Sequence, residues 1–171
     1  MACVIRRWRV SDQERLAEML SNPKVLDNLR DGLPYPYTPA DGETYIRSML
    51  AADEDKTFAF AITVDDRAIG SIGVFRRENI HFRTAELGYY IGEPYWGKGY
   101  ATSAVKQVCR YVFDHTDILR IFAEPFARNA ASCRVLEKCG FTREGLVRQG
   151  KFNQVYCDYY LYGLLKEDLT R

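Results

Sequence analysis

The stretch Tyr95-Trp96-Gly97-Lys98-Gly99-Tyr100-Ala101 lies between a run typical of a strand and a run typical of a helix. Before it, residues 85–91 are rich in aromatic and β-favouring side chains. After it, apolar residues recur at helical spacing as far as Val112. Paired glycines at a helix start let main-chain N–H groups surround an anion, and the helix dipole favours negative charge there. The pattern predicts a docking site for a phosphate group, although turn geometry alone would also explain two glycines.

This glycine-rich loop, residues 95–101, lacks the spacing of the two best-known nucleotide-binding loops. It has neither the G-x-x-x-x-G-K-[ST] pattern of a P-loop nor the third glycine of a dinucleotide-binding fold. A nucleotide triphosphatase and an NAD enzyme are therefore disfavoured. The ligand that carries the phosphate has to be inferred from the rest of the chain.

The composition is typical of a globular protein, since 47% of the 171 residues are hydrophobic and 27% are charged. The length fits one domain, which we expect to span residues 1–171. The 24 basic residues nearly balance the 23 acidic ones, which disfavours binding to nucleic acid or membranes. The five cysteines are odd in number and form no C-x-x-C pair, so we expect neither a disulfide framework nor a metal site. The N-terminus has no signal-peptide core, and a cytoplasmic location is expected.

Periodicity and turn signals predict one α/β domain built on a mixed sheet. Ser11 followed by Glu14 has the spacing of a capping box, and Thr38 before Pro39 predicts a second helix start. Gly140 predicts a helix end, and residues 22–37 are expected to be irregular. The expected strands span residues 3–10, 57–64, 67–75, 84–91, 119–124, 141–145 and 155–165, and the expected helices span 11–20, 38–52, 100–114 and 129–139.

Three motifs, in this order of elements, resemble the GNAT superfamily of N-acetyltransferases, and within it the RimJ/RimL type of ribosomal-protein-alanine acetyltransferase. They are residues 85–91 (AELGYYI), 95–101 (YWGKGYA) and 129–141 (NAASCRVLEKCGF). The resemblance covers essentially the whole chain. It implies a single mixed, mostly antiparallel central sheet with helices on both faces. It also implies an enzyme that moves an acetyl group directly from acetyl-CoA to a primary amine.

In this family the glycine-rich loop holds the pyrophosphate of coenzyme A, usually with Arg or Gln at its first position. Pro94 stands there in this chain, so main-chain N–H groups would have to bind the pyrophosphate. The resemblance implies that the end of strand 84–91 pairs with the pantetheine arm and that Ile91 or its neighbour polarises the acetyl carbonyl. Asn129 is expected to cap its helix and to contact the same arm. The implied acetyl-CoA-binding residues are Tyr89, Tyr90, Ile91, Trp96, Gly97, Lys98, Gly99, Tyr100, Ala101, Thr102, Asn129 and Ser132.

Direct transfer needs a base for the amine and a hydrogen-bond donor for the departing thiolate. Glu86 and Glu124 are alternative candidates for the base, each acting through a water, and each would otherwise be a solvated or ion-paired strand residue. Many superfamily members place a donor tyrosine seven residues after the helix-motif asparagine, where this chain has Leu136. In the RimJ/RimL branch the donor is a serine three residues after that asparagine, here Ser132. A serine there also serves simply to bond the first turn of its own helix.

The expected acceptor is a protein N-terminal amine or a small amine such as a polyamine, an amino acid or an aminoglycoside. Acceptor-lining residues are expected in segments 22–37 and 149–154, and they are Arg30, Asp31, Tyr35, Tyr37 and Phe152. No strongly acidic patch is present in these segments, which favours a peptide N-terminus or a neutral to anionic amine over a polycation.

The alternative function, suggested by Leu136, is a regulatory module that binds acetyl-CoA without turnover. Glu86, Glu124 and Ser132 argue against it. His81 and His115 are isolated in the sequence, so no metal is expected. A homodimer through the sheet edge is common among relatives and stays open here.

Overall fold

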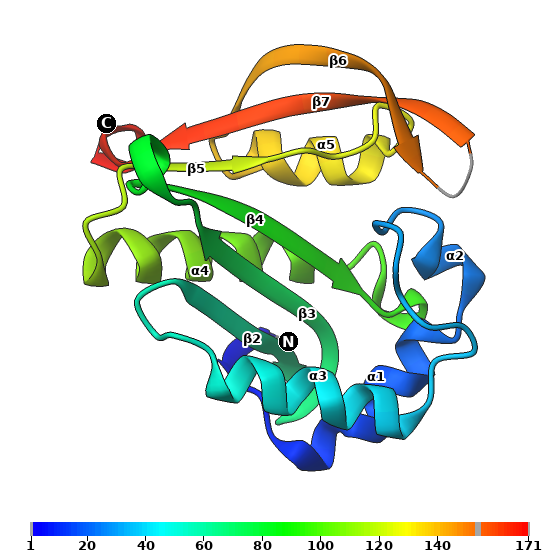
Figure 1. The fold of residues 1–171 in the computed structure, drawn as a ribbon. Coiled ribbons are helices and arrows are strands. Elements are labelled where there is room, and N and C mark those ends of the chain that lie inside the picture. Colours follow the sequence, from blue (N-terminus) through cyan, green and yellow to red (C-terminus); the bar gives the residue numbers. More distant parts are fainter. Residues whose placement is uncertain (1, 153–154, 171) are drawn as a thin grey trace.

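A mixed seven-stranded sheet in the order β1-β2-β3-β4-β5-β7-β6 forms the centre of the protein (Figure 1). The computed structural model describes residues 2–152 and 155–170. The strands are β1 (Val4–Arg7), β2 (Thr57–Val64), β3 (Arg67–Arg76), β4 (Thr84–Ile91), β5 (Arg120–Ala123), β6 (Thr142–Phe152) and β7 (Val155–Leu165). The α-helices are α1 (Gln13–Leu20), α2 (Pro23–Leu26), α3 (Pro39–Ala51), α4 (Tyr100–His115) and α5 (Ala130–Lys138). Short 3-10 turns are η1 (Val10–Asp12), η2 (Asn79–His81), η3 (Glu93–Tyr95) and η4 (Lys166–Thr170).

Helices cover both faces of the sheet because neighbouring strand residues point to opposite sides. On β2, Ala61 is buried in a cluster with Trp8 and with apolar residues of α1, α2 and α3. The next residue, Ile62, is buried in a second cluster with the apolar stripe of α4, which includes Val105 and Val112, and with α5. Burial of each large apolar side chain contributes ~1.5–3 kcal/mol, so the two clusters hold each helix to its face. The expected fold, a single mixed sheet with helices on both faces, is confirmed.

Strands β4 and β5 run parallel, unlike the other described strand pairs, and they separate after a short contact. Their last pair is Glu86 with Phe122. Beyond it, β4 continues to Ile91 beside β3, whereas the chain after β5 stays beside β7 through a bridge between Phe126 and Tyr159. The sheet therefore splits into two halves, β1 to β4 and β5-β7-β6, which diverge from a shared end (Figure 1).

Most expected elements are present, and the clearest error lies at the first helix. Helix α3 begins after Thr38, whose side chain caps it as expected. The capping box predicted at Ser11 is wrong, because Ser11 lies inside η1 and Asp12 is the residue before α1. The Asp12 carboxylate accepts the Arg9 N–H at 2.9 Å and pairs with Arg6, which moves the start of the helix past Ser11.

Three further differences concern the lengths of elements. Strand β1 ends at Arg7 rather than at residue 10. The segment expected to be irregular contains the short helix α2, whose first turn is capped by the Asn22 side chain accepting the Lys24 N–H at 3.0 Å. Strand β6 continues to Phe152, because its partner β7 pairs with it along its full length and extends it beyond residue 145.

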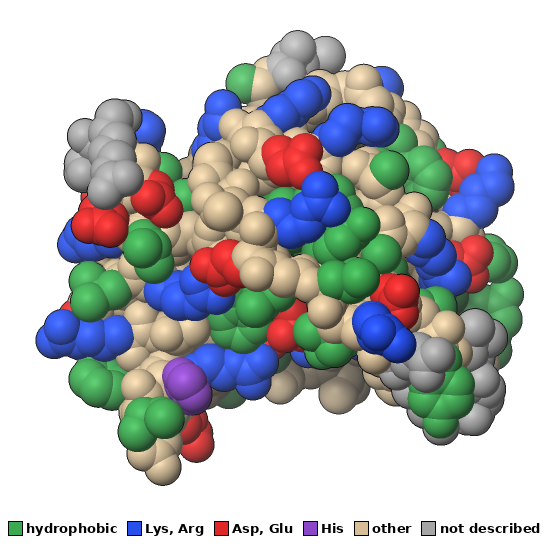
Figure 2. Space-filling view, turned by 90° about the horizontal axis from the view of Figure 1, so that it is seen from above, with side chains coloured by type: hydrophobic (Ala, Val, Ile, Leu, Met, Phe, Trp, Pro, Cys, Tyr) green, Lys and Arg blue, Asp and Glu red, His purple; other side chains and the backbone are tan. Residues whose placement is uncertain are grey.

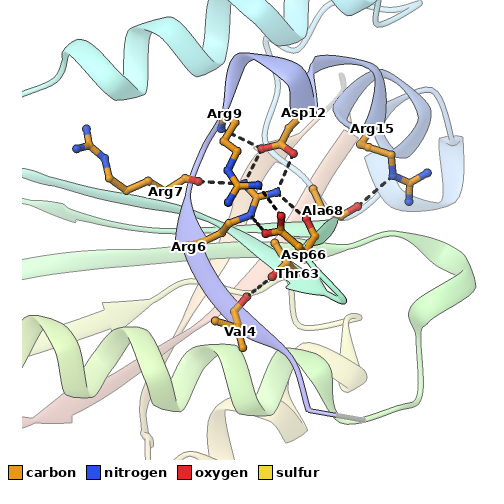
Figure 3. A network of polar contacts seen from close by, with 9 residues as sticks. All are labelled: Val4, Arg6, Arg7, Arg9, Asp12, Arg15, Thr63, Asp66 and Ala68. Carbon is orange, nitrogen blue, oxygen red and sulfur yellow. Dashed lines mark hydrogen bonds and ion pairs between the residues drawn. The ribbon is translucent and has the colours of Figure 1, made fainter.

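Charged side chains bind β1 to the turn between β2 and β3 (Figure 3). The Arg6 guanidinium donates to both Asp12 carboxylate oxygens, at 2.8 and 2.9 Å, and to Asp66 Oδ1 at 2.9 Å. Arg9 Nη1 donates to Asp66 Oδ2 at 2.6 Å. Burial raises the pKa of Asp12, but the hydrogen bonds from Arg6 and the Arg9 N–H outweigh it and hold that pKa below its ordinary value. This network joins the first strand, the start of α1 and the hairpin turn.

Candidate active site

The glycine-rich loop leads from β4 into α4 through two residues with left-handed backbone conformations. Gly97 has φ 73°, and Gly99, the N-cap of α4, has φ 80°. A Cβ at either position would meet no atom within 4 Å, so the conformation rather than crowding requires glycine. Trp96 Nε1 donates to the Ile91 carbonyl at 2.7 Å, which ties the loop to the end of β4. The backbone of the loop is thereby both anchored and accessible.

The first turn of α4 presents N–H groups that the helix itself does not use. The first bond into the helix runs from the Ser103 N–H to the Gly99 carbonyl at 3.1 Å. Three earlier N–H groups have no acceptor within the helix, those of Tyr100, Ala101 and Thr102. Together with the positive end of the helix dipole they make the start of α4 suited to an anion. Lys98 Nζ lies 5.7 Å from the Tyr95 ring centroid, which keeps a cation at the same end of the helix.

An open cavity of about 590 Å³ lies between the glycine-rich loop, the start of α5 and the segment around α2. Its volume is typical of sites for small molecules. Its lining includes Lys24, Asn28, Trp96, Arg128, Asn129 and Ala130. Asn129 caps α5 as expected, since its Oδ1 accepts the Ser132 N–H at 3.2 Å. The cavity therefore lies between Trp96 of the glycine-rich loop and the first turn of α5.

Alternate backbone groups of β4 face the split in the sheet. At the two ends of the β3–β4 pairing, the Arg77 N–H bonds the Thr84 carbonyl and the Gly92 N–H bonds the Ile69 carbonyl, each at 2.8 Å. Opposed residues of antiparallel strands alternate between bonded and non-bonded pairs. The backbone groups that point toward β3 are therefore those of Glu86, Gly88 and Tyr90, and those that point into the split are those of Leu87, Tyr89 and Ile91. Tyr90, one of the expected pantetheine partners, thus turns its backbone toward β3.

Ser132, the expected hydrogen-bond donor, lies in the first turn of α5 beside β4. Its Oγ is 2.7 Å from the Tyr89 hydroxyl oxygen, which also lies within hydrogen-bonding distance of the Ser132 carbonyl, at 3.3 Å. Burial raises the pKa of Tyr89 far above its ordinary value, although the hydrogen bond with Ser132 opposes the shift. No role for the Tyr89 side chain is predicted from the sequence, because the alternation of β4 only sets Tyr89 and Glu86 on opposite faces. Leu136 is fully buried in the core.

Glu86 and Glu124 lie beside one guanidinium group, that of Arg30. Arg30 Nη2 forms an ion pair with Glu86 and lies 3.6 Å from Glu124 Oε2. Arg77 Nη2 lies 2.7 Å from the other carboxylate oxygen of Glu86, and its guanidinium carbon is 5.2 Å from the Phe122 ring centroid. The Glu86 side chain is 12% exposed and that of Glu124 is 28% exposed. The structure thus brings the two candidate bases together beside the same guanidinium group.

Hydroxyl groups gather on the Glu86 face of β4, around Ser71. Burial raises the pKa of Tyr45 and, more strongly, that of Tyr90, while side-chain hydrogen bonding with Ser71 opposes both shifts. Burial, together with the nearby Asp41 and Tyr45, raises the pKa of Tyr37 to about 12. These hydroxyls stay protonated at neutral pH and offer hydrogen bonds rather than charge.

The two segments expected to line the acceptor side differ in what the structure shows. From residues 22–37, Arg30 contacts both glutamates and Tyr37 is buried beside Tyr45, whereas Tyr35 is 65% exposed. From residues 149–154, positions 153 and 154 and the side chains of Gln149, Lys151 and Phe152 lie outside the described residues. The bridging position of Arg30 between two carboxylates is a long-range contact that no local pattern indicates.

Surface charge is mixed on the face shown in Figure 2, where Lys and Arg side chains are interspersed with Asp and Glu. All five cysteines are free thiols. Among residues 2–152 and 155–170, no group of three or more His, Cys, Asp or Glu side chains is arranged to hold a metal ion. None of the helices in the described part of the chain has the length and apolar character needed to cross a membrane.

Comparison with known proteins agrees with this geometry. Residues 3–142 match the acetyltransferase (GNAT) domain. The chain is 36% identical over 126 residues to the probable N-acetyltransferase YjcK of Bacillus subtilis, covering 73% of this chain and 70% of YjcK. It is 29% identical over 171 residues to the putative ribosomal N-acetyltransferase YdaF of the same organism, covering 96% and 91% of the two chains.

Among solved structures, RimJ of Mycobacterium smegmatis in complex with CoA-disulfide superposes with a TM-score of 0.88 at 21% identity, covering 99% of this chain and 84% of RimJ. That likeness establishes the shared fold. With the family match and the YjcK and YdaF relatives, it leads to one conclusion: this chain belongs to the GNAT family of acetyltransferase enzymes and is similar to its RimJ/RimL branch.

Proposed function

We propose that this enzyme takes acetyl-CoA as its donor and transfers the acetyl group directly to a primary amine, with the α-amine of a protein N-terminus as the preferred acceptor. One observation carries the proposal. The Glu86–Glu124 pair and the Tyr89–Ser132 pair lie on opposite faces of β4, beside the part of its edge that β5 leaves free. A thioester bound in the split would have a base on one side and a hydrogen-bond donor on the other.

The donor would bind through backbone groups at its two ends. The N–H groups at the start of α4, following Gly97 and Gly99, suit the pyrophosphate. The Tyr89 and Ile91 N–H groups point into the split and suit the pantetheine amides and the acetyl carbonyl. The RimJ structure with the same fold holds a CoA derivative, which supports this assignment.

The chemical step would be attack by the neutral amine on the thioester carbonyl. An α-amine has a pKa near ~8, so at neutral pH most of it must lose a proton first. Glu86 or Glu124 would accept that proton through a water, and the C–S electron pair would leave on sulfur beside Ser132. Burial raises the pKa of the adjacent Cys133 thiol, which favours direct transfer over an acetylated cysteine.

The charges around the acceptor side favour a single amine over a polyamine. Arg30 and Arg77 balance Glu86 and Glu124, so these four side chains have no net charge. A polycation would need an excess of carboxylates. The hydroxyls around Ser71 offer hydrogen bonds to uncharged groups such as peptide amides. The relative YdaF is described as a putative ribosomal N-acetyltransferase, which also supports a protein acceptor.

The test is release of free thiol from acetyl-CoA across a matched panel of acceptors. The panel contains peptides with a free N-terminus, the same peptides with a blocked N-terminus and a free lysine, and a polyamine. We expect thiol release with free N-termini and little thiol release with blocked peptides. Mass spectrometry of the product should place the acetyl group on the α-nitrogen. Release with the polyamine alone would refute the protein acceptor, and no release with any amine would refute the enzymatic proposal.

A further inference from the structure

Tyr89 occupies a place on β4 from which its side chain reaches the first turn of α5 across the split. It is close to one residue in two ways, since its hydroxyl oxygen is 2.7 Å from Ser132 Oγ and 3.3 Å from the Ser132 carbonyl oxygen. The Ser132 N–H is bonded to Asn129 Oδ1. The Ser132 N–H is therefore fixed by its helix cap, and the Ser132 hydroxyl has the Tyr89 phenol as its neighbour.

Resting on the proposed function, we propose that Tyr89 is a positioning residue that holds the Ser132 hydroxyl so that its proton points toward the sulfur of the bound thioester. As the amine nitrogen bonds to the carbonyl carbon, the C–S bond breaks and its electron pair stays on sulfur. The Ser132 O–H donates a hydrogen bond to the thiolate, and the Tyr89 O–H donates to Ser132 Oγ. Both oxygens keep their protons, and the released thiolate takes a proton from water.

In this proposal the single phenol proton of Tyr89 goes to Ser132 Oγ, which at 2.7 Å is nearer than the Ser132 carbonyl oxygen at 3.3 Å. Burial raises the pKa of Tyr89 far above its ordinary value, so at neutral pH the phenol keeps a proton that it can donate to Ser132 Oγ. Once Oγ accepts that proton, the serine proton has to point elsewhere, and a donor bonded on its oxygen becomes a stronger donor itself. A serine alone is free to rotate its proton away from the thioester.

Other groups near α5 do not fill this role. Leu136, at the position where many superfamily members have a tyrosine, is fully buried and has no polar group. The phenol of Tyr162 does lie beside α5, but it donates to Glu137 Oε1 at 2.8 Å. Tyr89 is thus the phenol that the structure places on the Ser132 hydroxyl, and it comes from a strand rather than from the helix.

The experiment is a double-mutant cycle of Tyr89→Phe and Ser132→Ala. The kcat and the KM for each substrate are measured by varying that substrate while the other is saturating. Loss of one positioned hydrogen bond predicts that Tyr89→Phe lowers kcat about tenfold, with the KM for acetyl-CoA changed less than twofold. In the Ser132→Ala background the same substitution should leave kcat unchanged, because Tyr89 acts through Ser132. Tyr111→Phe, which removes a phenol on the exposed face of α4, is the matched control.

Additive effects in the cycle would overturn the inference, as would a change confined to KM, because a purely structural role gives either result. If Tyr89→Phe does not fold, the kcat values of Ser132→Thr and Ser132→Ala are compared instead. The inference requires threonine to keep most of kcat and alanine to lose it, and equal rates would overturn it. An inactive wild-type enzyme would instead refute the proposed function, whereas an active wild type with an additive cycle would refute this inference alone.

Discussion

Replacing Asp12 by Asn is expected to destabilise the fold by about 2–3 kcal/mol. The Asp12 carboxylate accepts two hydrogen bonds from Arg6 and one from the Arg9 N–H, and its side chain is 8% exposed. An amide has one acceptor oxygen and would turn an N–H toward a guanidinium. Removing one partner of a buried ion pair costs ~3–5 kcal/mol; Arg6 keeps its second partner, Asp66, which reduces the loss.

The assay is urea unfolding followed by circular dichroism, with Asp66→Asn as the matched control. Asp66 pairs with the same two arginines but its side chain is 62% exposed, so its replacement should cost less than ~1 kcal/mol. For a chain of this length, Asp12→Asn should lower the melting temperature by roughly 5–10 °C. If the Asp12 variant is no less stable than the Asp66 variant, burial of the pair does not determine its contribution and the reasoning is wrong.

The same variant carries a pH signature. The folded pKa of Asp12 lies below its ordinary value, so its contribution is fully present above the unfolded pKa of ~3.9 and is lost as pH falls through the folded pKa. The difference in unfolding free energy between wild type and Asp12→Asn should therefore stay constant at about 2–3 kcal/mol from pH 5 to 7. It should shrink in strong acid. A difference that grows toward low pH would contradict this sign.

Three further outcomes are expected. Gly99→Ala forces a residue with a side chain into φ 80°, which costs ~1–2 kcal/mol of left-handed strain. Calorimetry should therefore show acetyl-CoA binding weakened about fivefold or more. Unchanged affinity would mean that the loop is not part of the binding site. Arg30→Gln frees the two carboxylates from a competing cation. The KM for the amine acceptor should therefore fall about threefold, the size expected for an exposed ion pair. A higher KM would mean that Arg30 itself binds the acceptor. Thr38→Ala removes the cap of α3, and chemical denaturation should show a loss of ~1 kcal/mol without a change in kcat.

Local patterns in the sequence were sufficient for much of the fold. The apolar alternation and turn residues gave β2 and β4 their exact bounds, and Thr38 with Pro39 located the start of α3. The first helix was misplaced because the carboxylate of Asp12 is bound by Arg6, a tertiary contact that a capping pattern at Ser11 cannot reveal.

The candidate site shows the same division between local and distant information. Glycine spacing located the start of α4, because a helix N-terminus is formed by neighbours in sequence. The meeting of Arg30 with Glu86 and Glu124 joins residues that are far apart in the chain. The Tyr89–Ser132 pair depends on which face of β4 packs against α5, which the alternation alone leaves undecided until both elements are placed.

The early separation of β4 from β5 gives the free enzyme an incomplete ladder of amide hydrogen bonds in the middle of its sheet. The Leu87, Tyr89 and Ile91 amides should exchange with deuterated solvent faster than those of Glu86 and Tyr90, and a donor bound along that edge should slow them. At a hundred times its dissociation constant, such a ligand adds ~2.7 kcal/mol to stability. The abundance and half-life of the folded enzyme would then follow the supply of the proposed donor, even when no acceptor is present.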